Sequence, residues 1–200
     1  MSSRVLVVYA HPDPNSFCGS LRDLVVRTCD SRGAELRMHD LYDENFSAVV
    51  SANEWRLRGA EPSAKPHLAS HFADVAWCDT LIFVYPTWWS AQPAVLKAWV
   101  DRVLANDVAW NIEDTTGHAL PALRNVRRLL VITTHGRSKA VNFWCGQLGR
   151  FTLVRAVGRL CSWRCRAHWM ALYSLDRSTR DRKSTRLNSS HEWISRMPSS

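Results

Sequence analysis

Apolar residues along the chain form short continuous runs that alternate with longer segments of helical periodicity. The runs are typical of strands buried on both faces, because such strands have no polar side. We expect strands over residues 4–10, 35–41, 80–85, 127–133 and 168–175. Apolar positions three or four residues apart predict helices over residues 16–31, 67–78, 92–104 and 139–160, the last one broken near Gly149.

The order of these elements predicts an α/β fold in three layers. Strands that alternate with helices form a parallel sheet with helices on both faces. Since crossovers are right-handed, we expect a doubly wound five-stranded sheet in the order 2-1-3-4-5. Residues 43–66 lack steady periodicity and predict a long loop, with one helical turn over residues 53–59. Ligands of such sheets bind beyond the carboxyl ends of the strands.

The last part of the chain departs from this pattern. Residues 177–200 are rich in Ser and Arg and have little apolar periodicity, so the helix that usually follows a fifth strand is not recognisable there. The string KSTRLNSSH resembles adaptor- or vector-derived sequence. We therefore interpret residues 1–176 as one domain and residues 177–200 as an irregular, non-native tail, which resequencing of the gene would test.

Composition and charge narrow the class of protein. The formal net charge is +8, but residues 177–200 hold six Lys or Arg and only two acidic residues, so half of the excess lies in the tail. The remaining charge suits an enzyme that handles phosphates and does not predict a nucleic-acid partner. No apolar run is long enough to cross a bilayer. The six scattered cysteines predict reduced thiols and no metal site. The opening MSSRVLVVYAHPDP has too short an apolar stretch for a signal peptide, so we expect a cytoplasmic protein.

Three unusual segments follow the first, third and fourth predicted strands, so they share one edge of the sheet. The first, 10–17, ends at a helix N-terminus, where free N–H groups favour an anion and Ser16 and His11 add donors. A plain helix cap is the alternative for Ser16. The second, 85–93, offers the flat surfaces of Trp88 and Trp89 beside backbone amides, as an isoalloxazine ring requires; core packing is the alternative.

The third segment, 133–138, offers hydroxyl groups and amides that suit the pyrimidine edge or the ribityl chain of a flavin. Its candidate residues are Thr133, Thr134, His135 and Gly136. An ordinary turn between a strand and a helix is the alternative interpretation. Together the three segments predict a nucleotide-sized site.

These segments resemble a known family. H-P-x-P-x-S-F after the first strand, Y-P-T-W-W-S-A-Q-P-A-V-L-K-A-W-V-D-R-V after the third and T-T-H-G after the fourth are similar to the NAD(P)H:quinone oxidoreductases of the flavodoxin-like superfamily. The resemblance covers roughly residues 4–176, and its middle segment is the most specific. It implies a flavodoxin-like fold, FAD or alternatively FMN, NAD(P)H as electron donor, a quinone-like acceptor and a homodimer.

The resemblance also implies roles for particular residues. The phosphate and adenosine side of the cofactor would be met by His11, Ser16 and Phe17. The isoalloxazine would be bordered by Pro86, Thr87, Trp88 and Trp89. Its far edge would be held by Thr133, Thr134 and Gly136.

The chain departs from the family pattern after the fourth strand. Some relatives have a second glycine where this chain has His135, and the best-known ones carry a Tyr and a His where Val141 and Gln147 stand. No Tyr/His proton relay is therefore assigned, and His135 is the candidate catalytic residue. The Thr-, Ser- and Gly-rich phosphate loop of small electron-carrier flavodoxins is also missing after the first strand.

The sequence therefore predicts a flavin-dependent oxidoreductase that takes hydride from NAD(P)H and passes two electrons to a quinone or similar acceptor in a ping-pong cycle. An azo- or nitroreductase on the same scaffold is one alternative. A second is a flavin-binding ancillary subunit that regulates a potassium efflux system. A third is a flavin-free structural or redox-sensing protein.

Overall fold

The structure is a computed structural model, and it describes residues 2–113 and 115–175. Five parallel strands form its central sheet in the order β2-β1-β3-β6-β7. They are β1 (Arg4–Tyr9), β2 (Glu35–Asp40), β3 (Thr80–Pro86), β6 (Arg128–Thr134) and β7 (Arg166–Leu172). The expected order 2-1-3-4-5 is thus confirmed. Every expected strand is present, although β7 begins and ends earlier than the sequence predicted. The predicted tail, residues 177–200, lies outside the described residues.

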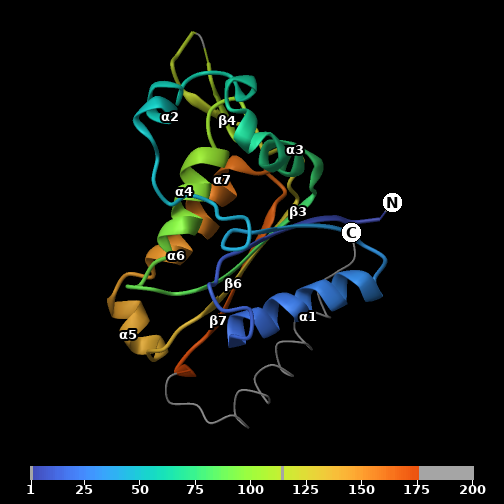
Figure 1. The fold of residues 1–200 in the computed structure, drawn as a ribbon, viewed down its shortest axis with the longest axis vertical. Coiled ribbons are helices and arrows are strands. Elements are labelled where there is room, and N and C mark those ends of the chain that lie inside the picture. Colours follow the sequence, from blue (N-terminus) through green and yellow to red (C-terminus); the bar gives the residue numbers. More distant parts are fainter. Residues whose placement is uncertain (1, 114, 176–200) are drawn as a thin grey trace.

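Helices cover both faces of the sheet (Figure 1). One face carries α1 (Phe17–Ser31), and the other carries α3 (Ala69–Trp77), α4 (Ala94–Val103) and the segments after β6. Alternate residues of β1 point to opposite sides: Val5 and Val7 pack under α1, whereas Leu6 and Val8 join the core under α3 and α4. Because both sets are buried, the strand reads as a continuous apolar run.

The segment between β2 and β3 is largely a loop with short helical turns. They are α2 (Ala52–Arg56), η1 (Pro62–Ala64) and η2 (Pro66–Leu68). The loop is tied to α4 through Arg102, whose Nε donates to Glu54 Oε1 at 2.5 Å and whose Nη1 donates to the carbonyl of Ser47 at 2.7 Å. The predicted single helical turn is therefore present as α2, and α3 begins two residues later than expected.

The helical region after β6 is more broken than the sequence predicted. It consists of α5 (Lys139–Trp144), α6 (Leu148–Arg150), the π-helical segment η3 (Phe151–Val157) and α7 (Gly158–Leu160). The break falls at Gly146 and Gln147, which both have positive φ, three residues before the expected position at Gly149. Gly149 instead lies against Tyr85, where a Cβ atom would come within 2.7 Å of the phenolic oxygen.

Two further features lie outside the expected pattern. A small antiparallel hairpin of β4 (Trp110–Ile112) and β5 (Ala119–Pro121) projects from the domain. Its strands have three residues each and are mostly exposed, so they leave no apolar run in the sequence. Among the described helices, none combines the length and the hydropathy that a membrane span requires.

Candidate functional site

A cavity of about 490 Å³ opens at the carboxyl ends of β3 and β6. Its walls come from the loop between β3 and α4, from the end of β6 and from α5. The lining residues are Thr87, Trp89, Ser90, His135, Gly136, Arg137, Val141, Asn142 and Cys145. The position agrees with the rule that doubly wound sheets bind ligands beyond the carboxyl ends of their strands.

The loop after β3 is a tight turn that projects one tryptophan into solvent. Trp88 and Ala91 exchange backbone N–H···O hydrogen bonds of 3.0 Å in both directions. The two residues between them, Trp89 and Ser90, have φ angles of 47° and 64°. Positive φ at both central positions is the conformation that turns the chain back most tightly. As a result the side chain of Trp89 is 99% exposed at the cavity, while Trp88 does not line it.

The floor of the cavity is a small polar cluster. The hydroxyl groups of Thr87 and Thr133 are 2.8 Å apart, and the Thr87 hydroxyl lies 3.3 Å from His135 Nε2. The Thr87 N–H donates to the carbonyl of Thr134 at 2.7 Å, which joins the ends of β3 and β6. The Thr87 hydroxyl is therefore placed where it can be shared between the protein and a bound ring.

His135 is a neutral group in this floor. Its side chain stacks on Tyr173 with ring centroids 4.7 Å apart, and the residue is buried. Burial lowers the pKa of His135 to about 4, because a charged imidazolium is poorly solvated there. Near neutral pH the ring can exchange a hydrogen bond with Thr87, but it brings no positive charge to the cavity.

Helix α5 forms another part of the cavity wall. Ser138 begins the helix as its N-cap, with its hydroxyl accepting from the Val141 N–H. Arg137 directly precedes this cap, and Val141 and Cys145, four residues apart, lie on one side of the segment that follows it. Asn142 lies beside them and is only 4% exposed.

Sequence reasoning missed Ser90, Arg137, Val141, Asn142 and Cys145 as lining residues. The four-residue spacing of Val141 and Cys145 after the cap Ser138 was the available signal. The cavity does include four of the residues that the sequence singled out, namely Thr87, Trp89, His135 and Gly136. Their binding of a cofactor stays a prediction.

The first predicted loop does not line this cavity. Ser16 is the N-cap of α1, and its hydroxyl accepts from the Gly19 N–H at 3.0 Å. The Nδ1 atom of His11 accepts from the Asp13 N–H at 3.0 Å, and Phe17 packs against the core under α1. Pro86, Trp88, Thr133 and Thr134 also lie outside the lining, although the two threonines bond to Thr87. Roles for His11, Ser16 and Phe17 therefore require a ligand that extends beyond the cavity.

A separate polar cluster lies between β2 and α3. His39 Nδ1 is 2.8 Å from Glu44 Oε1, and His71 Nε2 is 3.8 Å from Glu44 Oε2. Among the described residues this trio has the spacing of metal ligands. However, the Trp99 indole N–H donates to His71 Nδ1 at 3.2 Å, so the proton of the neutral ring lies on Nε2, toward Glu44. The cluster is therefore best described as a hydrogen-bonded network within the fold.

Comparison with known proteins finds one matching family model and related proteins of known sequence. A family model described as "Flavodoxin-like fold" matches residues 3–161. A "Ribosyldihydronicotinamide dehydrogenase [quinone]" of Pongo abelii is 32% identical over 152 residues, which are 68% of this chain and 65% of that protein. The chain thus spans about 65% of the length of this relative.

Two solved structures share the fold over nearly their whole length. Smu.1420 from Streptococcus mutans UA159 has a TM-score of 0.83 at 25% identity, covering 97% of this chain and 100% of that one. An FMN-dependent NADH-azoreductase from Bacillus anthracis has a TM-score of 0.73 at 17% identity, covering 98% and 100%. The architecture is therefore shared well beyond the residues that line the cavity.

Proposed function

The chain belongs to the flavodoxin-like fold family, and on that premise we propose that it is a flavin-dependent NAD(P)H oxidoreductase that reduces a quinone-like acceptor. The observation that carries the proposal is the cavity at the ends of β3 and β6, which is lined by Trp89 and by residues of α5. Both the place and the residue types suit a planar ring with a polar edge.

The residues of the cavity fit a flavin. An isoalloxazine needs apolar surface for its faces and hydrogen-bonding groups for its edge, and Trp89 and Val141 supply the first. Thr87 and the amide at Gly136 supply the second. When bound, a flavin supplies the redox chemistry: it accepts hydride from NAD(P)H and gives two electrons to an acceptor in a ping-pong cycle.

The chain's own residues would bind and orient the ring. Thr87 would share its hydroxyl with the ring edge while Thr133 and His135 hold that hydroxyl in place. Because His135 is neutral, it would serve as a hydrogen-bonding partner of Thr87 and would exchange a proton only at Nε2. Val141 brings no proton-transfer group to the wall, so protons of a quinone would come from water or through the Thr87–His135 pair.

The names of related proteins support this chemistry and leave the acceptor open. The Pongo abelii relative is named as a quinone-dependent dehydrogenase, which favours a quinone acceptor. The Bacillus anthracis structure is an azoreductase with FMN, so azo compounds are the second candidate and FMN is an alternative to FAD. Analysis of the released flavin by chromatography would decide between the two cofactors.

The absorption spectrum of the purified protein tests the proposal. We expect bands of oxidised flavin that NADH or NADPH bleaches under anaerobic conditions and that a quinone restores. Trp89→Ala is expected to weaken flavin retention roughly tenfold, which corresponds to a stacking contribution of about 1.4 kcal/mol. The exposed position of Trp89 means that the variant should fold normally.

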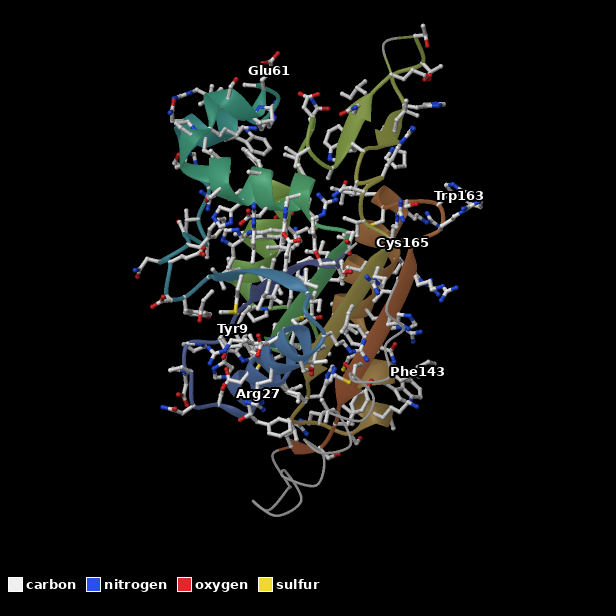
Figure 2. All side chains as sticks on the ribbon, turned by 90° about the vertical axis from the view of Figure 1, so that its right-hand side faces the viewer. Tyr9, Arg27, Glu61, Phe143, Trp163 and Cys165 are labelled. Carbon is white, nitrogen blue, oxygen red and sulfur yellow. The ribbon has the colours of Figure 1, made fainter. Side chains whose placement is uncertain are left out.

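Trp163→Ala is the matched control, because Trp163 is also largely exposed but lies in the turn before β7, away from Phe143 and α5 (Figure 2). A colourless wild-type protein that cannot be reconstituted with FAD or FMN would refute the proposed function. Equal flavin affinity in the Trp89 and Trp163 variants would instead remove Trp89 from the site.

We also propose that two copies of the chain associate through the exposed apolar face next to the cavity, defined by Phe143, Trp144, Leu148 and Phe151. Phe143 is 72% exposed and Trp144 is 89% exposed, and the four residues lie along α5, α6 and η3. A contiguous apolar surface of this kind usually marks an interface. A second copy would cover it beside Trp89 and close the open side of the cavity.

Sedimentation velocity measures the oligomeric state of the protein directly. We expect the wild-type protein to sediment as a dimer and Trp144→Ser to shift it toward monomer at micromolar concentration. Trp144 does not line the cavity, so the flavin site is left in place. A wild-type protein that stays monomeric at all concentrations would contradict the proposed assembly.

A further inference from the structure

The lining of the cavity carries positive charge at one end only. Of its lining residues, all within the described part of the chain, Arg137 alone carries a formal charge near neutral pH. The other ionisable residues of the lining are His135, which burial keeps neutral, and Cys145 with its thiol. No lining residue is acidic, so nothing in the wall neutralises the guanidinium. Arg137 is exposed while His135 is buried, so the charge lies at the open end of the cavity.

Asn142 supplies a second, independent observation. The residue lines the cavity and is 96% buried, since only 4% of its surface is exposed. Its amide nitrogen Nδ2 has no hydrogen-bond partner among the described residues. A buried donor without a partner costs about 1–3 kcal/mol, so a ligand that brings an oxygen acceptor relieves this cost. The cavity lining thus holds one buried donor without a partner among the described residues, on Asn142, and one exposed cationic donor, on Arg137.

We propose that Arg137 and Asn142 form an anion-binding subsite of the acceptor cavity, so that the protein favours acceptors bearing a carboxylate or sulfonate over neutral ones. The inference rests on the proposed function, because it names the class of acceptor for the same cavity. An Arg guanidinium pairs with such groups in a planar, two-pronged geometry. An amide donor beside it suits a carbonyl or a second anionic oxygen of the same molecule.

The residues at the start of α5 combine two hydrogen-bond donors with two less polar side chains. Arg137 immediately precedes the cap Ser138, and Asn142 lies one turn into the helix, so a short segment presents both donors. Val141 and Cys145 on the same wall are less polar and suit the ring of the acceptor. A planar aromatic acid or sulfonate has the matching division into an apolar ring and a charged edge.

The test compares two acceptors of similar size, anthraquinone-2-sulfonate and the neutral 2-(hydroxymethyl)anthraquinone. Dissociation constants are measured by tryptophan fluorescence quenching on the purified full-length protein, without turnover. We expect the wild type to bind the sulfonate roughly tenfold more tightly, as for a charge-assisted hydrogen bond of about 1.4 kcal/mol. In Arg137→Gln and in Asn142→Asp this preference is expected to fall to about twofold or less.

Lys139→Gln is the matched control. Lys139 carries the same charge as Arg137 and lies two residues after it, but it is exposed and does not line the cavity. It is expected to keep the tenfold preference. Equal affinity of the wild type for both compounds would overturn the proposal. A loss in Lys139→Gln as large as in Arg137→Gln would also overturn it, because the effect would then come from overall charge.

The midpoint potential of the bound flavin tests whether Arg137 acts on the cofactor and not on the acceptor. If Arg137→Gln lowers this potential while the sulfonate preference persists, the guanidinium serves the cofactor and the acceptor subsite is refuted. Failure of the proposed function gives a different result: the sulfonate preference would be present, but the protein would bind no flavin, or neither NADH nor NADPH would reduce the flavin that it binds. The two inferences therefore fail in distinguishable ways.

Discussion

Gly19→Ala is expected to destabilise the protein more than an alanine substitution at any other glycine of the described residues. Gly19 lies in the first turn of α1, directly against the loop that follows β1. A Cβ atom built there would come within 2.0 Å of the Pro14 carbonyl oxygen and 2.9 Å of its carbon. Both are backbone atoms, so the contact is relieved only if α1 moves away from the loop. We expect a loss of roughly 3 kcal/mol or more of unfolding free energy, at the upper end of overpacking effects.

Urea unfolding followed by circular dichroism measures this loss. Gly59→Ala is the matched control, because a Cβ atom at Gly59 meets nothing within 4 Å and the residue has no positive φ. The control is expected to stay within about 0.5 kcal/mol of the wild type. A Gly19→Ala protein as stable as Gly59→Ala would show that the loop after β1 yields easily, and would weaken the view that it is a preformed part of the site.

The same variant tests the role predicted for His11, Ser16 and Phe17. These residues lie on the loop and helix start that Gly19 holds together, but they do not line the cavity. If a cofactor extends from the cavity to this loop, Gly19→Ala should weaken its binding even at temperatures where the variant stays folded. Titration of the variant with FAD and with FMN then shows which cofactor depends on the loop.

The inner strands of the central sheet could be predicted from the sequence because β1, β3 and β6 are buried on both faces. Leu6 and Val8 face one core and Val5 and Val7 the other, so the pattern is continuous and easily recognised. The hairpin of β4 and β5 was not predictable in this way. Its strands are short, mostly exposed and held by only a few hydrogen bonds, so no apolar pattern marks them.

The candidate site was predictable only where it follows directly from the sheet. Thr87, His135 and Gly136 come at or just after strand ends, so the rule for doubly wound sheets finds them. Trp89 was found by its residue type, but its full exposure depends on positive φ angles that neither Trp nor Ser signals in a sequence. Arg137 and Asn142 were missed although the helix was expected to begin at residue 139, because the sequence pattern did not show which residues of this segment face the cavity.

Acid is expected to destabilise the fold between about pH 6.5 and pH 4 through two buried histidines. Burial is the main cause that lowers the pKa of His71 to about 4, helped by its neighbour His39, and burial alone does the same for His135. A histidine in the unfolded chain has a pKa of about 6.5. Below that pH the two histidines bind protons in the unfolded chain but stay neutral in the folded protein. The stabilisation is therefore complete above pH 6.5 and is lost as the pH falls to about 4.

Each histidine accounts for as much as about 3 kcal/mol of this loss, since one pKa unit corresponds to about 1.4 kcal/mol. Chemical unfolding at a series of pH values measures the slope. His71→Asn keeps an acceptor for the Trp99 indole, and His135→Gln keeps a polar group near Thr87, yet neither side chain titrates. Each variant is expected to flatten the slope between pH 6.5 and 4. A slope that stays as steep as in the wild type would mean that these histidines are already charged in the folded protein, and His135 would then bring positive charge to the floor of the cavity.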